Sequence, residues 1–207
     1  MAAHDAPSTA PADTAAHGPA IDWIRTLHAK GRGPLRAAHL RHRAPAARPA
    51  RLHLLLIDHS GSMQRQGRLA LAKGCAERLL AQAVRQGDEA GVLAFGGRAA
   101  VWLQAPGRAR RAMAVRLRTL GSGGGTPLAQ ALQVAETTLQ RRRRQGAPVE
   151  AWLWLLTDGR ALHTPPRPRG IDQLVLVDHD DPLAPAGRGP QWARLWQASW
   201  LRARALA

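Results

Sequence analysis

The sequence is short of several residue types, and each shortage excludes a class of protein. Cys75 is the only cysteine, which excludes an internal disulfide and a cysteine-rich zinc site. No apolar run approaches the roughly 20 residues that a membrane-spanning helix needs. The first 20 residues contain no Lys or Arg and no apolar segment, so they lack the features of a signal peptide. We therefore expect a cytoplasmic protein with no membrane span, whose 207 residues suffice for one folded domain.

Acidic residues are also scarce, at 14 Asp and Glu against 30 Lys and Arg, which gives a formal net charge of +16. Such a charge indicates an anionic partner: a nucleic acid, a membrane surface or an acidic protein. Much of the excess is local, because the stretch from Trp23 to Ile57 contains eight basic residues and no acidic residue. We identify this stretch as a candidate partner-binding segment, with Arg32, Arg36, Arg41 and Arg43 as its contact residues.

Composition divides the chain into three regions. Residues 1–20 are rich in Ala, Pro, Thr and His, which predicts a disordered tail. Residues 21–51 predict a basic connecting segment with a short helix at 21–30. Residues 52–207 predict the folded domain.

Apolar patterns predict that strands and helices alternate in the folded domain. The predicted strands lie at 52–57, 151–156 and 174–177, and a hairpin joins 90–95 to 99–103. The predicted helices lie at 69–83, 108–120, 128–144 and 191–205, the third ending in the run Arg141–Arg144 before Gly146. Cys75 lies beside the apolar stripe of the first of these helices, and we expect it to be buried. The alternation indicates an α/β fold: a doubly wound, mainly parallel sheet with one antiparallel edge strand and helices on both faces.

Oxygen-bearing side chains follow the predicted strands at the edge where such sheets bind ligands. They are Asp58, Ser60 and Ser62 after the first strand, Thr126 at the start of a helix, and Asp158 after a later strand. An all-oxygen set of this kind suits Mg²⁺, or another divalent cation such as Mn²⁺. Each piece also has a simpler interpretation, as a polar turn, a helix N-cap or an Asp-Gly turn. Their common order along the sheet favours the metal site.

The charges of this set indicate binding rather than catalysis. Two carboxylates neutralise a divalent ion and three hydroxyls add no charge, so the ion stays electrophilic and can accept a carboxylate from a partner. His59 is the only imidazole in these loops, and no catalytic triad or acid–base pair accompanies it. His59 either supports the metal ligands from behind or points outward, and we expect it to point outward.

At these residues the sequence resembles the von Willebrand factor A domain and its metal-ion-dependent adhesion site. The family pattern is Asp-x-Ser-x-Ser, a Thr on a second loop and an Asp on a third, and Asp58, Ser60, Ser62, Thr126 and Asp158 match it position by position. The resemblance implies that the hydroxyls contact Mg²⁺ directly or through water and that the aspartates do so mostly through water. It also implies the doubly wound sheet that the apolar patterns predict.

A narrower similarity is to the C-terminal domain of the magnesium chelatase D subunit. The segments that carry it are 21–27, 57–63, 70–74, 123–128 and 155–160. The D subunit normally has an AAA+ module, whereas this sequence contains no Walker-type loop, so ATP hydrolysis is expected to belong to another chain. Residues 159–172, which contain three prolines, are too proline-rich for a full crossover helix. Either the sheet is uncovered there and offers apolar surface to a partner, or the final predicted helix folds back and covers it with its three tryptophans; we favour the second.

The resemblance implies a non-catalytic, metal-dependent adaptor in an ATP-driven chelatase that inserts Mg²⁺ or Co²⁺ into a tetrapyrrole. We favour the cobalt route, as in cobalamin biosynthesis. The expected partners are a separate AAA+ ATPase subunit and a large tetrapyrrole-binding subunit. Two alternatives stay open: an adaptor for an unrelated AAA+ ATPase in metalloenzyme maturation, and an Arg-rich nucleic-acid-binding protein, which we favour least.

Overall fold

A computed structural model describes residues 23–31, 33–40, 50–146 and 149–206 of the chain. The chain forms two compact units, residues 1–48 and residues 49–207. In the first unit, helix α1 (Trp23–Lys30) is followed by the short 3-10 helix η1 (Ala37–His39), so the helix predicted at 21–30 is confirmed over 23–30. The predicted tail, residues 1–20, lies outside the described residues.

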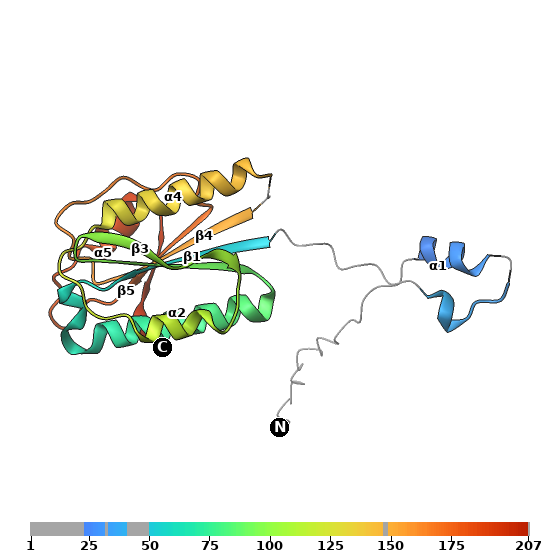
Figure 1. Cartoon of the computed structure of the whole chain (residues 1–207), viewed down its shortest axis with the longest axis horizontal. Coiled ribbons are helices and arrows are strands. Elements are labelled where there is room, and N and C mark those ends of the chain that lie inside the picture. The colour runs from blue at the N-terminus through green and yellow to red at the C-terminus, as the bar shows by residue number, and fades with distance from the viewer. Residues whose placement is uncertain (1–22, 32, 41–49, 147–148, 207) are drawn as a thin grey trace, which may run out of the picture. The chain divides into compact units, whose positions relative to one another are not determined.

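The second unit is built on a six-stranded sheet (Figure 1). Its strands are β1 (Ala50–Asp58), β2 (Glu89–Gly96), β3 (Ala99–Arg108), β4 (Val149–Thr157), β5 (Gln173–Asp178) and β6 (Ser199–Arg202). Their spatial order is β3-β2-β1-β4-β5-β6, and β3 alone pairs antiparallel to its neighbour. The predicted fold class is therefore confirmed.

Helices cover both faces of this sheet because each presents an apolar stripe. Helix α2 (Arg68–Gln86) lies on one face with α3 (Met113–Arg118), and α4 (Leu128–Arg144) lies on the other with α5 (Gly189–Leu195) (Figure 1). Two 3-10 helices, η2 (Gly61–Gly67) and η3 (Ala203–Ala205), complete the unit. Among the described residues, no helix combines the length and apolarity required to cross a membrane.

β1 lies at the centre of both cores, as its continuous apolar run predicts. Leu54 and Leu56 pack into the core beneath α4, whereas Leu55 and Ile57 pack into the core beneath α2, because successive side chains of a strand point to opposite faces. All four side chains are fully buried. β1 therefore carries Asp58 on a strand that is fixed from both sides.

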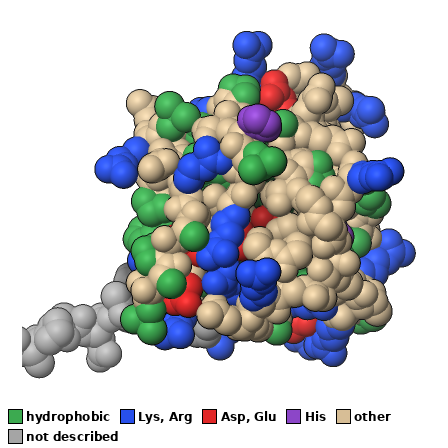
Figure 2. Space-filling model, turned by 90° about the vertical axis from the view of Figure 1, so that its left-hand side faces the viewer, with side chains coloured by type: hydrophobic (Ala, Val, Ile, Leu, Met, Phe, Trp, Pro, Cys, Tyr) green, Lys and Arg blue, Asp and Glu red, His purple; other side chains and the backbone are tan. Residues whose placement is uncertain are grey.

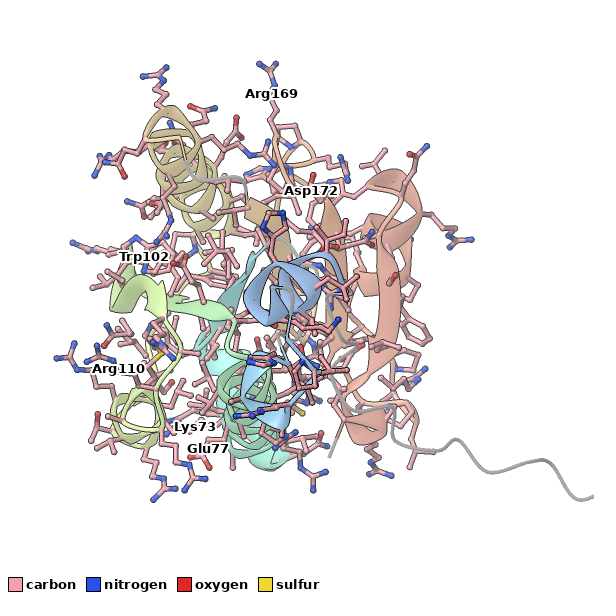
Figure 3. The ribbon with its side chains drawn as sticks, turned by 90° about the vertical axis from the view of Figure 1, so that its right-hand side faces the viewer. Lys73, Glu77, Trp102, Arg110, Arg169 and Asp172 are labelled. Carbon is pink, nitrogen blue, oxygen red and sulfur yellow. The ribbon has the colours of Figure 1, made fainter. Side chains whose placement is uncertain are left out.

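α2 and α3 are also joined by polar contacts at their exposed sides. Arg118 Nε donates to Glu77 Oε1 at 3.0 Å, and Lys73 Nζ donates to the Arg118 carbonyl oxygen at 3.0 Å. Lys73 and Glu77 lie one turn apart on α2 (Figure 3). On the other face, the predicted end of α4 is confirmed, since Arg144 is its last residue and Gly146 adopts a φ of 80°.

The predicted final helix at 191–205 is wrong in its second half. α5 ends at Leu195, Gln197 adopts a φ of 50°, and residues Ser199–Arg202 form β6, parallel to β5. The apolar stripe that includes Trp200 has helical spacing. The backbone of Ser199–Arg202 nevertheless pairs with β5, and this long-range pairing cannot be predicted from the spacing.

Trp192 and Trp196 cover the crossover from β4 to β5, as expected for part of that predicted helix. Each is 1% exposed, and the two indoles donate to Thr164 Oγ1 at 2.9 Å and to the Pro165 carbonyl oxygen at 3.1 Å. Residues 158–172 contain no helix, so these indoles replace the usual crossover helix as the cover of the sheet.

Candidate metal centre

Three loops meet at the edge of the sheet where the parallel strands end. β1 and β4 are neighbours, and the chain continues to β2 on one side of this pair and to β5 on the other. The crevice between them is the topological switch point at which doubly wound sheets bind ligands. This edge faces the viewer in Figure 2, where basic and acidic side chains lie together near the middle of the face.

Asp58 is fully buried at the end of β1 and accepts two hydrogen bonds. Ser60 N donates to Oδ1 at 2.9 Å, and Thr157 Oγ1 donates to Oδ2 at 2.7 Å. Burial raises the pKa of Asp58, the hydrogen bonds from Thr157 and Ser60 oppose that rise, and the negative charge of Asp158 adds to it. Among the described residues no basic side chain pairs with Asp58, so an external cation would stabilise its charged form.

The hydroxyls of the predicted set lie on the two loops beside Asp58. Ser60 Oγ and Ser62 Oγ are 3.2 Å apart, the first residue buried and the second half-buried. Thr126 is half-buried before α4; its carbonyl oxygen accepts from Leu128 N, and no side-chain hydrogen bond caps this helix. The N-cap interpretation of Thr126 is therefore not supported.

The glycine-rich turn before Thr126 is held against the loop after β1. Gly123 N donates to the His59 carbonyl oxygen at 2.7 Å, and Gly61 N donates to the Gly124 carbonyl oxygen at 3.1 Å. A Cβ at Gly123 would lie 2.7 Å from Gly97 N, so the close approach of these backbones requires glycine there. These contacts bring the loop of Thr126 to the loop of Ser60 and Ser62.

The expected outward orientation of His59 is wrong. Its Nδ1 lies 3.0 Å from the Gly121 carbonyl oxygen, and a Cβ at Gly96 would lie 2.8 Å from its Cδ2. The half-buried imidazole thus fills the space between the β2–β3 turn and the glycine-rich turn.

Asp158, also fully buried, lies beside two arginines that sequence reasoning missed. Its Oδ2 is 3.4 Å from Arg68 Nη1 and 3.6 Å from Arg160 Nε, and its Oδ1 accepts from Arg160 N at 3.3 Å. Arg160 Nη2 also donates to Asp180 Oδ1 at 2.8 Å. Arg160 stands two residues from Asp158 in the sequence, whereas Arg68 is 90 residues away, so no local motif connects Arg68 with Asp158.

The residues present fit an oxygen-ligated divalent cation. In the described part of the chain, no group of three or more His, Cys, Asp or Glu side chains is placed to hold a metal, so a cation here would depend on the hydroxyls as well. Two buried carboxylates with neighbouring hydroxyls match the preference of Mg²⁺ and Mn²⁺ for oxygen ligands. The five-residue metal set stays a prediction.

The predicted contact residues of the basic segment lie mostly outside the described residues, as Arg32, Arg41 and Arg43 do. Arg36 is described and exposed, and its backbone N donates to His39 Nδ1 at 3.1 Å. Their role in partner binding stays a prediction.

Comparison with known proteins identifies the fold and the relatives. Residues 53–160 match the family model of the von Willebrand factor type A domain. The magnesium-chelatase 60 kDa subunit of Cereibacter sphaeroides is 43% identical over 111 residues, which cover 53% of this chain and 19% of that protein. The magnesium-chelatase 60 kDa subunit of Rhodobacter capsulatus is 37% identical over 110 residues, with the same shares covered. This chain thus matches about a fifth of the length of each relative.

A solved structure shows the same fold at lower identity. A von Willebrand factor type A structure from Catenulispora acidiphila superposes with a TM-score of 0.58 at 20% identity, over 76% of this chain and 40% of that chain. Together these matches confirm both resemblances noted from the sequence.

Proposed function

Because this chain belongs to the von Willebrand factor type A domain family, we propose that it is the non-catalytic, Mg²⁺-dependent protein-binding subunit of an ATP-driven metal chelatase. The observation that carries the proposal is the pair of fully buried carboxylates at the ends of neighbouring strands, Asp58 as the last residue of β1 and Asp158 directly after β4, with the Ser60 and Ser62 hydroxyls on the loop after β1. Its partners are an AAA+ ATPase subunit and a large tetrapyrrole-binding subunit, and the inserted ion is Mg²⁺ or Co²⁺.

The surroundings of the site favour binding over catalysis. The Ser60 hydroxyl lies 3.2 Å from the Ser62 hydroxyl, and Nδ1 of His59 lies 3.0 Å from the Gly121 carbonyl oxygen. The described residues therefore provide no imidazole that activates a hydroxyl in this site. Asp58, Ser60 and Asp158 would hold a bound Mg²⁺, and this ion would supply an electrophilic centre for a partner carboxylate.

Exposed apolar side chains near this edge support protein docking. Leu162 is 86% exposed on the loop after β4, and Leu183 is 93% exposed on the loop after β5. Both loops leave neighbouring parallel strands at the edge that carries Asp158. A partner segment that presents a carboxylate to the cation can bury these leucines beside it.

The proposal is tested by pull-down of the candidate ATPase subunit from the same organism, with Mg²⁺ or with excess chelator. We expect the wild type to bind the ATPase subunit in Mg²⁺ but not in excess chelator. The variants Asp58→Ala and Thr126→Ala should not bind it in either condition. The matched controls are Asp172→Ala and Thr119→Ala, which remove the same groups from exposed positions elsewhere and should bind as the wild type does. Binding that persists in chelator would refute the metal bridge.

The same variants distinguish the proposed function from the alternative that the chain binds nucleic acid. A protein that binds nucleic acid through its arginines loses affinity steeply as salt rises and is indifferent to Asp58→Ala. Such behaviour, without binding to the ATPase subunit, would replace the proposal.

A further inference from the structure

Asp158 already has two cationic neighbours before any metal is considered. Arg68 begins α2, is 7% exposed, and places Nη1 3.4 Å from Asp158 Oδ2. Arg160 places Nε 3.6 Å from the same oxygen, and this nitrogen is buried without a hydrogen-bond acceptor. A divalent cation at Asp158 would therefore approach two guanidinium groups from close range.

The two arginines differ in what else neutralises them. Arg160 shares its charge with Asp180, whose Oδ2 is in turn held by Ala186 N at 2.6 Å and Gly187 N at 2.7 Å. Arg68 has only the neutral Gln66 Oε1, at 2.8 Å, as its other side-chain acceptor among the described residues. The exposed carboxylate of Asp181 accepts from Gln66 Nε2 at 3.2 Å, and the charge of Arg68 helps to lower its pKa, but solvent screens this fully exposed group far more than it screens the buried Asp158. Repulsion of a cation should therefore come mainly from Arg68.

Neither guanidinium can move away easily. Arg68 is enclosed at the start of a helix, and Arg160 is tied to a loop that lies directly against the Asp158 backbone, where Gly187 leaves no room for a Cβ. A buried charge whose partner is taken away is strongly unfavourable. Binding of a cation at Asp158 is thus opposed until another anion enters the site.

We propose that Arg68, assisted by Arg160, makes cation binding at this site depend on an acidic partner. The arginines weaken binding of the cation alone, and a partner carboxylate that joins the cation offsets their repulsion. Because such coupling is reciprocal, the partner's carboxylate binds well only with the cation, and the cation binds well only with the carboxylate. This inference rests on the proposed function and adds to it the residues that keep the free protein largely unloaded.

The test is titration of the whole chain with Mn²⁺, with free Mn²⁺ followed by electron paramagnetic resonance. The probes are an acetylated Gly-Asp-Gly amide and the corresponding Asn peptide. In the wild type, the Asp peptide should raise the affinity for Mn²⁺ and the Asn peptide should not. In Arg68→Gln, Mn²⁺ should bind about tenfold more tightly without peptide, and the gain from the Asp peptide should shrink by the same factor.

Two further variants keep this test decisive. Arg160→Gln should act in the same direction with a smaller effect, and its partly exposed side chain makes it the safer variant if Arg68→Gln fails to fold. Arg143→Gln is the matched control, because it removes an arginine from an exposed pair with Asp172 and should leave Mn²⁺ affinity unchanged. Unchanged or weaker Mn²⁺ binding in folded Arg68→Gln and Arg160→Gln would overturn the inference.

Asp58→Ala separates this inference from the proposed function. If Asp58→Ala binds Mn²⁺ as the wild type does, the metal site itself is wrong and both proposals fall. If Asp58→Ala loses Mn²⁺ while the arginine variants match the wild type, only the coupling is wrong.

Discussion

The two edges of the sheet differ in how completely their charged and polar side chains are paired. At the edge where the parallel strands begin, each acidic side chain has a basic partner of its own: Arg51 Nε lies 2.8 Å from Glu150 Oε2, and Arg143 Nη2 lies 3.1 Å from Asp172 Oδ2. At the edge where the strands end, Asp158 and Asp180 do have arginine neighbours, but in the described part of the chain Asp58 is buried without a basic partner and both ring nitrogens of His179 are buried without a hydrogen bond. The first edge is complete in itself, whereas the second leaves polar groups for an outside ligand to satisfy.

Two buried histidines show the same contrast. His53, in the first half of β1, has Nε2 3.2 Å from Asp88 Oδ2, and its Nδ1 accepts from Trp154 Nε1 at 3.2 Å. His179 directly follows β5, and burial alone lowers its pKa to about 4. Both histidines make the stability of the fold depend on pH, and His179, whose ring nitrogens have no hydrogen-bond partner among the described residues, should do so more strongly than His53.

The largest effect expected from this contrast is therefore a loss of stability in acid. His179 binds a proton near pH 6.5 in the unfolded chain but only near pH 4 in the folded chain, so its contribution is complete above the higher value and is lost as the pH falls between them. The free energy of unfolding should decrease by up to about 3 kcal/mol over this window. Urea unfolding at several pH values measures it.

His179→Leu should flatten that pH dependence, and the slope that is left should include the smaller contribution of His53, whose pKa burial also lowers against the opposing effect of Asp88. A slope identical to that of the wild type in His179→Leu would show that His179 is not protected from protonation in the fold.

A smaller effect is expected from Thr157→Val, which removes the hydroxyl that donates a hydrogen bond to the Asp58 carboxylate. The Thr157 hydroxyl donates to Asp58 and accepts from Gly159 N at 3.1 Å. Its loss should cost about 1–3 kcal/mol of folding stability and weaken Mn²⁺ binding about tenfold, because it orients a candidate ligand. Thr138→Val, which removes a hydroxyl bonded only within α4, is the control and should not change Mn²⁺ binding. Equal Mn²⁺ affinity in the two variants would show that Thr157 does not orient Asp58.

The smallest effect is expected at the opposite edge. Asp172, labelled in Figure 3, pairs with Arg143, and both side chains are more than two-fifths exposed. Arg143→Gln should change the free energy of unfolding by less than about 0.5 kcal/mol, because solvent and salt screen such a pair. A loss as large as that of Thr157→Val would mean that the two edges are not as different as their burial indicates.

Local patterns predict most of this fold but not its charge pairing. The apolar run at 52–57 and the helical stripes at 69–83 and 128–144 are properties of short segments, and the structure confirms them. The region after Leu195 was predicted wrongly because β6 exists only through its pairing with β5.

In the candidate site, too, the features that belong to short segments can be predicted and the long-range contacts cannot. Its oxygen ligands stand at the ends of predicted strands and could be named from the sequence. The approach of Arg68 to Asp158 joins segments 90 residues apart, and the place of His59 depends on glycines of two other turns. Such contacts follow from the packing of loops and leave no periodic pattern in the sequence.

The position of β1 has a mechanical consequence. The preceding chain enters β1 at Ala50, and the candidate cation site begins at its other end, Asp58, while β2 and β4 flank it on both sides in parallel register. A pull between a partner held at the cation and the chain before Ala50 would act along this strand. The hydrogen bonds to both neighbours would then bear the load together in shear instead of opening one after another. The central strand is thus the direct connection between the chain before Ala50 and the candidate cation site.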